Sequence, residues 1–227
     1  MIAVVIPAHN EAELAGACVA SVQAAAKAPE LNGEQVIVVV VADSCTDATL
    51  EIVEVLGAIA IVVNVRNVGI ARAVGATKAL EAGARWLAFT DADSVVARDW
   101  LAAQMRQQSD AVCGTVTVED WGEYSESMRS HYARSYNDRD GHRHIHGANL
   151  GVCANAYRRA GGFPPLQSSE DVALVDALIA IGANVTWSAA PRVVTSARRN
   201  FRAPDGFGAT LLRVHAQAAH AVRPLPC

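Results

Sequence analysis

The segment VIVVVVADSCTDATLEIV (residues 36–53) joins a continuous apolar run to a short polar loop and then to apolar residues at helical spacing. A continuous apolar run is typical of a strand buried on both faces, and a helix that follows it is typical of the right-handed crossover to a parallel neighbour. The same order recurs three times within residues 1–110. It predicts a doubly wound α/β structure with strands at 2–8, 36–42, 58–64 and 86–90 and helices at 11–27, 46–57, 70–83 and 98–108.

The pattern changes after residue 110, where regular strand–helix units give way to a mixed succession. No linker rich in Pro, Gly or Ser separates the two halves. We therefore expect one domain, in which the second half extends the sheet of the first. The predicted elements of this half are strands at 111–118, 146–154 and 184–195, a polar helical excursion at 122–138, and a helix at 170–181 with Ser168 or Ser169 as its cap.

The composition of the 227-residue chain excludes several classes of protein. A formal net charge of -4 and a pI of about 6.0 give no general attraction to nucleic acid, and no long Lys/Arg tract supplies a local one. The apolar run at 36–42 is far too short to span a membrane, and residues 1–20 have no basic signal-peptide region, so we expect a cytoplasmic protein without a transmembrane segment. The five cysteines are dispersed and odd in number, which argues against a disulfide framework.

Polar residues follow each of the four predicted strands of residues 1–110. In an open α/β sheet these carboxyl ends face the ligand-binding crevice. The glycine-rich loops of dinucleotide-binding and P-loop proteins are absent, and the crevice is acidic instead. Carboxylates repel a bare phosphate but bind Mg²⁺ or Mn²⁺, which in turn binds phosphate oxygens, so a metal-bound diphosphate is the expected ligand. The acidic residues are Glu11, Asp43, Asp91 and Asp93, and strand alternation predicts that the last two share one side.

Six motifs follow one another along the chain: P-x-H-N-E, D-S-x-T-D-x-T, N-x-G-x-A-R-x-x-G, D-x-D, G-x-N with a later G-G-F, and E-D-x-x-L. In this order they resemble the inverting family 2 glycosyltransferases of the GT-A fold, and the resemblance runs from about residue 2 to 196. The segments that carry it are VVIPAHNEAELAGACVASV (4–22), VIVVVVADSCTDATLEIV (36–53), NVGIARAVGATKAL (67–80), FTDADSVVARDWL (89–101), HGANLGVCANAYRRAGGFPP (146–165) and SSEDVAL (168–174).

The resemblance implies a metal-dependent enzyme that moves a sugar from a UDP- or GDP-linked donor to an acceptor hydroxyl with inversion. It implies Mn²⁺ or Mg²⁺ as cofactor and a single GT-A domain over 1–227. Asp171 is then the general base with Glu170 beside it, while Asp93 binds the metal directly and Asp91 reaches the metal or the ribose. The implied donor-binding residues are Pro7, Ala8, Asn10, Glu11, Asp43, Arg72, Asp91 and Asp93.

The domain is expected to divide by role into a nucleotide-binding half (1–110), an acceptor-binding half (111–200) and a helical C-terminal tail (201–227). For the acceptor pocket we expect His146 at its floor with Gly147 and Asn149. Trp121 has two readings, because its ring suits either stacking on a sugar or covering core. The alternating His142, His144 and His146 also raise a zinc site, although the outer two are too far apart in a strand to share one small ion.

Some features leave alternatives open. Ala42 stands where the family usually has the first of two adjacent acids, so base recognition through Asp43 has one contact fewer. The arginine-rich stretch at 196–202 suits either a loop that closes over the diphosphate or a solvated turn. A catalytically weak nucleotide-sugar-binding protein is the first rival function. A sugar-phosphate nucleotidyltransferase is the second, but it would carry a Gly-rich, basic loop after the first strand. A homodimer through the apolar positions of 206–222 also stays open.

Overall fold

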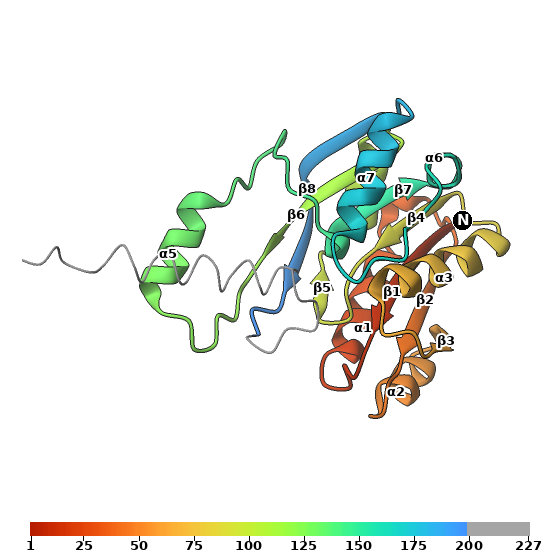
Figure 1. Cartoon of the computed structure of the whole chain (residues 1–227), viewed down its shortest axis with the longest axis horizontal. Coiled ribbons are helices and arrows are strands. Elements are labelled where there is room, and N and C mark those ends of the chain that lie inside the picture. The colour runs from red at the N-terminus through yellow and green to blue at the C-terminus, as the bar shows by residue number, and fades with distance from the viewer. Residues whose placement is uncertain (199–227) are drawn as a thin grey trace, which may run out of the picture.

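A computed structural model describes residues 1–198 as one eight-stranded sheet with helices on both faces (Figure 1). The strand order is β3-β2-β1-β4-β7-β6-β8-β5. The first-half strands all run parallel, and each is separated from the next by a helix, which confirms the doubly wound prediction. These strands are β1 (Ile2–Ala8), β2 (Val36–Asp43), β3 (Ile59–Val63) and β4 (Trp86–Phe89).

The second half extends the same sheet with mixed directions, as predicted. Its strands are β5 (Ser94–Val96), β6 (Ala111–Thr117), β7 (Leu150–Cys153) and β8 (Val185–Thr195). β7 runs antiparallel to both β4 and β6, β6 runs parallel to β8, and β8 runs antiparallel to β5. The fold is therefore a mostly parallel α/β sheet with a mixed C-terminal elaboration.

Two apolar layers hold the helices against the sheet. On β1, Ile2, Val4 and Ile6 face one layer, and Ala3 and Val5 face the other, as strand alternation requires. The first layer contains residues of α1, α2 and α4, and the second contains residues of α3, α6 and α7. The helix bounds are α1 (Ala15–Ala25), α2 (Thr49–Val55), α3 (Val68–Glu81), α4 (Trp100–Arg106), α6 (Ala154–Arg159) and α7 (Glu170–Ala180).

Helix α3 carries glycine at two close contacts, one with the sheet and one with the loop before α7. A Cβ on Gly75 would lie 2.4 Å from a methyl group of Val5, and a Cβ on Gly69 would lie 2.3 Å from the Pro164 carbonyl oxygen. The Asn67 side chain caps the helix by accepting a hydrogen bond from the Ile70 amide at 2.9 Å. The motif N-x-G-x-A-R-x-x-G thus fixes where α3 starts and how deeply it sits.

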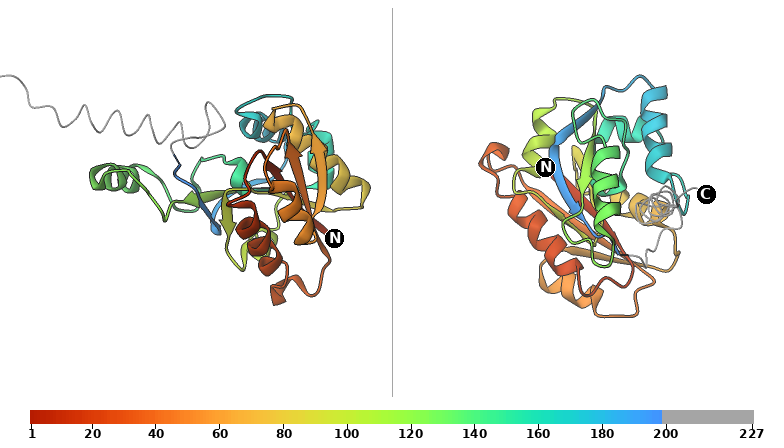
Figure 2. Two further views of the ribbon diagram at one scale, coloured as in Figure 1. Left: turned by 90° about the horizontal axis from the view of Figure 1, so that it is seen from below. Right: turned by 90° about the vertical axis from the view of Figure 1, so that its left-hand side faces the viewer.

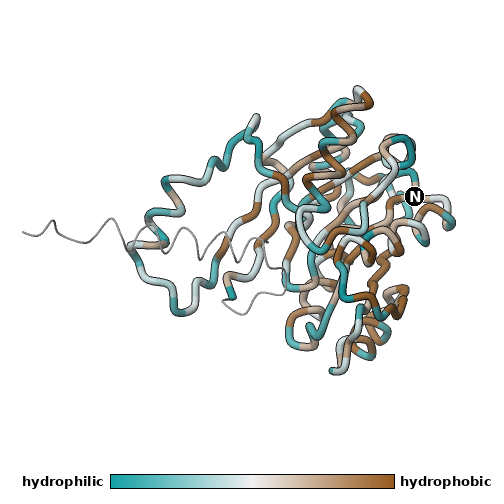
Figure 3. The backbone as a smooth tube through the Cα atoms, viewed as in Figure 1, coloured by the Kyte–Doolittle hydropathy of each residue, from teal (hydrophilic) through white to brown (hydrophobic). Residues whose placement is uncertain are grey.

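Helix α5 (Glu126–Ser135) and its connecting segments project from the body of the domain (Figures 1 and 2). Apolar segments gather in the sheet and the helices that cover it, whereas this arm is mainly hydrophilic along its length (Figure 3). The arm has a small apolar cluster of its own, made of Tyr124, Met128, Tyr132 and Ala197. Ala197 follows β8, so the cluster joins the arm to the end of the last strand.

Several sequence predictions differ from the structure in detail. β3 is an edge strand and is partly exposed, with Val62 at 59% exposure, so its apolar run does not mean burial on both faces. Strand β5, helix α6 and a 3-10 turn at Pro29–Leu31 were not predicted. The predicted strand 146–154 begins instead as a 3-10 turn (Gly147–Asn149). Ser169 is the residue before α7, but it has a left-handed backbone with φ of 59° and its side chain makes no capping hydrogen bond.

The expected tail at 201–227 lies outside the described residues, as do Arg199 and Arg202 of the arginine-rich stretch. Within residues 1–198, no helix combines the length and the hydrophobicity needed to cross a membrane.

Candidate active site

Two loops at the carboxyl ends of β1 and β2 are tied together by hydrogen bonds. The Asn10 side-chain oxygen accepts from the Thr46 amide at 2.7 Å, and the Asp47 carboxylate accepts from the Ala12 amide at 3.1 Å. The Glu11 amide donates to the Thr49 hydroxyl at 2.7 Å. The motifs that follow β1 and β2 therefore build one rigid rim, next to Pro7 and Ala8 at the end of β1.

Asp43, the last residue of β2, is a buried carboxylate that organises the next loop. Its oxygens accept three backbone hydrogen bonds of 2.9 Å, from the amides of Val65, Arg66 and Asn67. Burial by itself raises the pKa of Asp43, but these donors outweigh it and the pKa lies below its usual range. Asp43 is thus held ionised, and part of its acceptor capacity is already used by the loop that starts α3.

Arg72 of α3 connects the two sides of the site. One terminal nitrogen contacts Asp91 at 2.5 Å and the other contacts Glu170, the first residue of α7. Arg72 is only 4% exposed, and its two terminal nitrogens contact protein carboxylates. Glu170 is likewise buried and paired, which explains the first acid of the E-D motif.

Gly147 packs against the Arg72 guanidinium and is hydrogen-bonded to Asp171. The Gly147 amide donates to Oδ2 of Asp171 at 2.7 Å, and the Val172 amide donates to Oδ1 at 2.8 Å. The Asp171 carboxylate also lies in the first turn of α7, at the positive end of the helix dipole. This carboxylate is only partly buried and is oriented by two amides.

Gly147 is required by close packing. An added Cβ would lie 2.4 to 2.6 Å from the Arg72 guanidinium, which its two carboxylate partners hold in place. We expect Gly147→Ala to lower the free energy of unfolding by about 1–3 kcal/mol, the usual cost of overpacking. Urea denaturation measures this. Gly16→Ala in α1 is the control, because its Cβ meets only ordinary contacts at 3.5 Å or more, and an equal loss in both variants would contradict the packing argument.

The D-x-D segment forms a turn, not a strand. β4 ends at Phe89, and the Ser94 amide closes a turn by donating to the Asp91 carbonyl at 3.0 Å. The expected strand alternation therefore does not apply to Asp91 and Asp93. Their carboxylates are still close enough for Asp91 to raise the pKa of Asp93.

Glu11, from the loop after β1, and Asp93 share one cation. The Arg198 guanidinium contacts the two Glu11 oxygens at 2.5 and 2.7 Å and an Asp93 oxygen at 3.1 Å. Burial, followed by the charges of Asp91 and Glu11, raises the pKa of Asp93 to about 6 against the opposing effect of Arg198. A buried cluster of hard oxygen donors that already attracts a cation fits Mg²⁺ or Mn²⁺.

The described residues do not provide a complete metal site. Among residues 1–198, no three His, Cys, Asp or Glu side chains are arranged to hold an ion by themselves. An ion at Asp93 would therefore take further oxygen ligands from a diphosphate or from water. The same finding leaves the zinc alternative for the histidine tract without the geometry that it needs in this part of the chain.

The histidine tract forms a stack of rings. His142 and His144 lie 5.4 Å apart, His144 and His146 lie 5.8 Å apart, and Tyr136 stacks on His144 at 4.2 Å. The Tyr136 hydroxyl accepts from the Val116 amide and lies 2.9 Å from Nε2 of His146, to which it can donate. This arrangement favours neutral imidazoles, because a protonated Nε2 would lose its role as acceptor.

The stack makes stability depend on pH. Burial, followed by the nearby His144 and His142, lowers the pKa of His146 to about 3, whereas a histidine in the unfolded chain titrates near 6.5. Below a pH of about 6.5 this histidine binds a proton in the unfolded chain but stays neutral in the folded protein. The free energy of unfolding therefore falls as the pH drops. Between pH 7 and 5 we expect wild-type protein to lose up to about 2 kcal/mol more than His146→Gln in urea denaturation. Equal losses would contradict this assignment.

Two of the expected acceptor residues have structural positions. Asn149 is 1% exposed, and its amide accepts from the Trp100 indole and donates to the carbonyls of Thr115 and Pro191. The side chain thus joins α4, β6 and β8, and its place at the floor of an acceptor pocket stays a prediction. Trp121 packs edge-on against Tyr124 and Tyr132 in the α5 arm, and a role in stacking on a sugar stays a prediction.

Sequence reasoning missed one residue of the loop that follows β1. His9 directs Nδ1 at the Asp43 carbonyl oxygen, 2.6 Å away, and thereby places an imidazole ring beside the end of β2. The position within P-x-H-N-E was visible, but its bond to Asp43 was not, because 34 residues separate the two.

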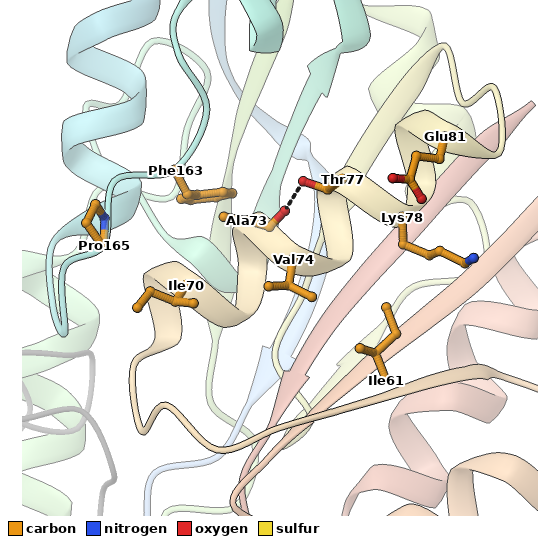
Figure 4. Close-up of a pocket in the computed structure, with 9 residues that line it drawn as sticks. All are labelled: Ile61, Ile70, Ala73, Val74, Thr77, Lys78, Glu81, Phe163 and Pro165. Carbon is orange, nitrogen blue, oxygen red and sulfur yellow. Dashed lines mark hydrogen bonds between the residues drawn. The ribbon is translucent and has the colours of Figure 1, made fainter.

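A separate apolar groove of about 400 Å³ lies between α3, β3 and the loop at 163–165 (Figure 4). Its lining contains Lys78 and Glu81 as the only charged residues, with Phe163 and Pro165 at one end. Its lining includes none of the acidic residues Glu11, Asp43, Asp91 and Asp93, so it is separate from the strand-end loops that carry them.

Comparison with protein families adds the decisive observation. The model of "Glycosyl transferase family 2" matches residues 3–161. The chain belongs to glycosyltransferase family 2. The match includes the loops of Glu11 and Asp43, Arg72 and the D-x-D turn, and it ends before Asp171. Comparison with curated proteins found no significant match.

Solved structures support the same fold for this family 2 chain. TarS 1-349 from S. aureus in complex with UDP-GlcNAc is similar at a TM-score of 0.66 and 18% identity, over 99% of this chain and 68% of that one. Mannosyltransferase PcManGT from Pyrobaculum calidifontis in complex with GDP-Man and Mn²⁺ is similar at 0.63 and 20% identity, over 99% and 65%. The chain thus spans about two thirds of these structures, and the likeness establishes the GT-A fold.

Proposed function

We propose that the protein is a metal-dependent, inverting glycosyltransferase that takes its sugar from a UDP- or GDP-linked donor. The observation that carries the proposal is the cation-binding pair formed by Glu11 and Asp93, at the strand ends of a family 2 domain. The complexes of similar structures with UDP-GlcNAc and with GDP-Man and Mn²⁺ support this donor class.

The proposed chemistry divides the carboxylates into two groups. Asp93, with Asp91, would hold a divalent ion, which would neutralise the departing nucleoside diphosphate. On the acceptor side, Asp171 would take the proton of the acceptor hydroxyl. At the same time the oxygen of that hydroxyl forms a bond to the anomeric carbon. The bond from that carbon to the diphosphate breaks at the same time, and the diphosphate leaves with the electron pair. Attack from the face opposite to the leaving group inverts the anomeric centre.

Arg72 would fix the position of the metal-binding carboxylates relative to the general base. It is paired with Asp91 on the donor side and with Glu170, the neighbour of Asp171, on the acceptor side. Gly147 packs against Arg72 and donates to Asp171, so one compact unit supports both carboxylates. The rival nucleotidyltransferase function is not favoured by the family match, and the rival of a non-catalytic binder is rejected by any measurable transfer or donor hydrolysis.

Isothermal titration tests the proposal directly. The protein is titrated with UDP and with GDP, each with and without Mn²⁺. We expect one nucleotide to bind only when the metal is present, which would also identify the donor base. Failure of both nucleotides to bind under both conditions would contradict the proposed donor class.

A further inference from the structure

Arg198 occupies the position of the cation at the proposed donor site. Its guanidinium forms a fork with both oxygens of Glu11, and one of the same nitrogens reaches Asp93 at 3.1 Å. The side chain of Arg198 is 26% exposed, and those of Glu11 and Asp93 are 7% and 16% exposed. A paired contact of this kind, between groups that are largely removed from water, is much stronger than a surface ion pair.

The chain around Arg198 is anchored in a way that holds this contact. The Thr195 hydroxyl, at the end of β8, accepts from the Ser94 hydroxyl at 3.0 Å, only one residue from Asp93. Ala197 is 6% exposed and packs with Tyr124, Met128 and Tyr132 of the α5 arm. The Arg198 amide donates to the Ser196 hydroxyl at 3.2 Å. The end of β8 therefore sits between the arm and the acidic cluster.

We propose that Arg198, anchored by its fork to Glu11, is an internal counter-cation that competes with the divalent ion for Asp93. This inference rests on the proposed function, because it assigns the ion to the same carboxylates. Arg198 contacts one Asp93 oxygen at 3.1 Å, and a metal ion cannot take that same oxygen at bonding distance while the guanidinium stays there. An ion bound through this oxygen must therefore displace Arg198, and the apparent affinity for the metal alone falls in proportion to the fraction of protein in which the oxygen is free.

The competition has a consequence for the order of binding. A free divalent ion has to displace the arginine without compensation. An ion that arrives with a diphosphate brings negative phosphate oxygens to which the released guanidinium can bind as a fork. The site is then loaded by the metal–nucleotide complex more readily than by the metal alone.

The test is a titration of the intact protein with Mn²⁺ in the absence of nucleotide, followed by the paramagnetic resonance signal of free Mn²⁺. We expect Arg198→Gln to bind Mn²⁺ about tenfold more tightly than wild-type protein, which corresponds to the loss of one such competing contact. Arg198→Lys keeps the positive charge but loses the fork to Glu11, so its Mn²⁺ affinity should lie between those of wild-type protein and Arg198→Gln. Arg106→Gln is the matched control. It removes one positive charge from α4, where Arg106 makes an exposed ion pair with Asp99, the residue before the helix.

Thermal denaturation of each variant shows that it is folded before the titrations are compared. Unchanged Mn²⁺ affinity in folded Arg198→Gln, or an equal gain in Arg106→Gln, would overturn the proposal. Its failure is distinguishable from that of the proposed function. If wild-type protein binds a nucleotide with Mn²⁺ but Arg198→Gln gains no affinity for the metal, only the competition is wrong. If neither protein binds Mn²⁺ or nucleotide, both proposals fall.

Discussion

Asp93→Asn should abolish most of the metal-dependent binding of the nucleotide while leaving the protein folded. The amide preserves the shape of the side chain but removes the charge that a divalent ion requires. We expect the affinity for UDP or GDP in the presence of Mn²⁺ to fall about 100-fold, the upper range for losing one charge-assisted contact. Isothermal titration with and without Mn²⁺ measures the change.

Asp99→Asn is the matched control for this prediction. Asp99 lies six positions along the chain, just before α4, and makes an exposed pair with Arg106. Its loss should leave nucleotide binding unchanged. Wild-type affinity in Asp93→Asn would show that the metal, if it is needed, binds elsewhere.

Asp171→Asn should bind the donor normally but transfer almost no sugar, in contrast to Asp93→Asn, which should lose nucleotide binding. An amide cannot accept the proton of the acceptor hydroxyl, and a positioned general base contributes roughly 100-fold to 10,000-fold to such a rate. We expect turnover to fall about 1,000-fold while the affinity for the nucleotide with Mn²⁺ stays at the wild-type value. Release of nucleoside diphosphate from the donor, with titration in parallel, separates the two effects.

The control for Asp171→Asn lies on the same helix. Asp176 is an exposed acid of α7, so Asp176→Asn changes the charge of the helix without touching the site. Turnover equal to wild type in Asp171→Asn would remove this residue as the base. A parallel loss of nucleotide binding would instead indicate that the unit of Gly147, Arg72 and Glu170 had been disturbed.

The sequence predicted most of the fold because the information is local. Continuous apolar runs marked β1, β2 and β4, and the intervening helical spacing marked the crossovers, since periodicity reports how each segment is buried. β3 shows the limit of this reasoning. Its run is as apolar as the others, yet it is exposed because it lies at the edge of the sheet, and strand order is a tertiary property.

The candidate site divides in the same way. The acids at the ends of β1, β2 and β4 were visible in the sequence, because a polar residue after a buried strand is a local signal. Which of them face a ligand and which face each other was not. Glu170, the neighbour of Asp171, is a buried partner of Arg72, and the Asn149 side chain is buried among α4, β6 and β8; neither contact is visible in the sequence.

The sequence by itself thus determined the family, the parallel half of the sheet and the acidic character of its crevice. Only the tertiary structure decided the pairings: Arg72 with Glu170 across 98 positions, Gly147 with Asp171, and Arg198 with Glu11 across 187 positions. The physical reason is that an ion pair depends on distance and burial after packing. Neither quantity is set by the residues next to a charged side chain in the chain.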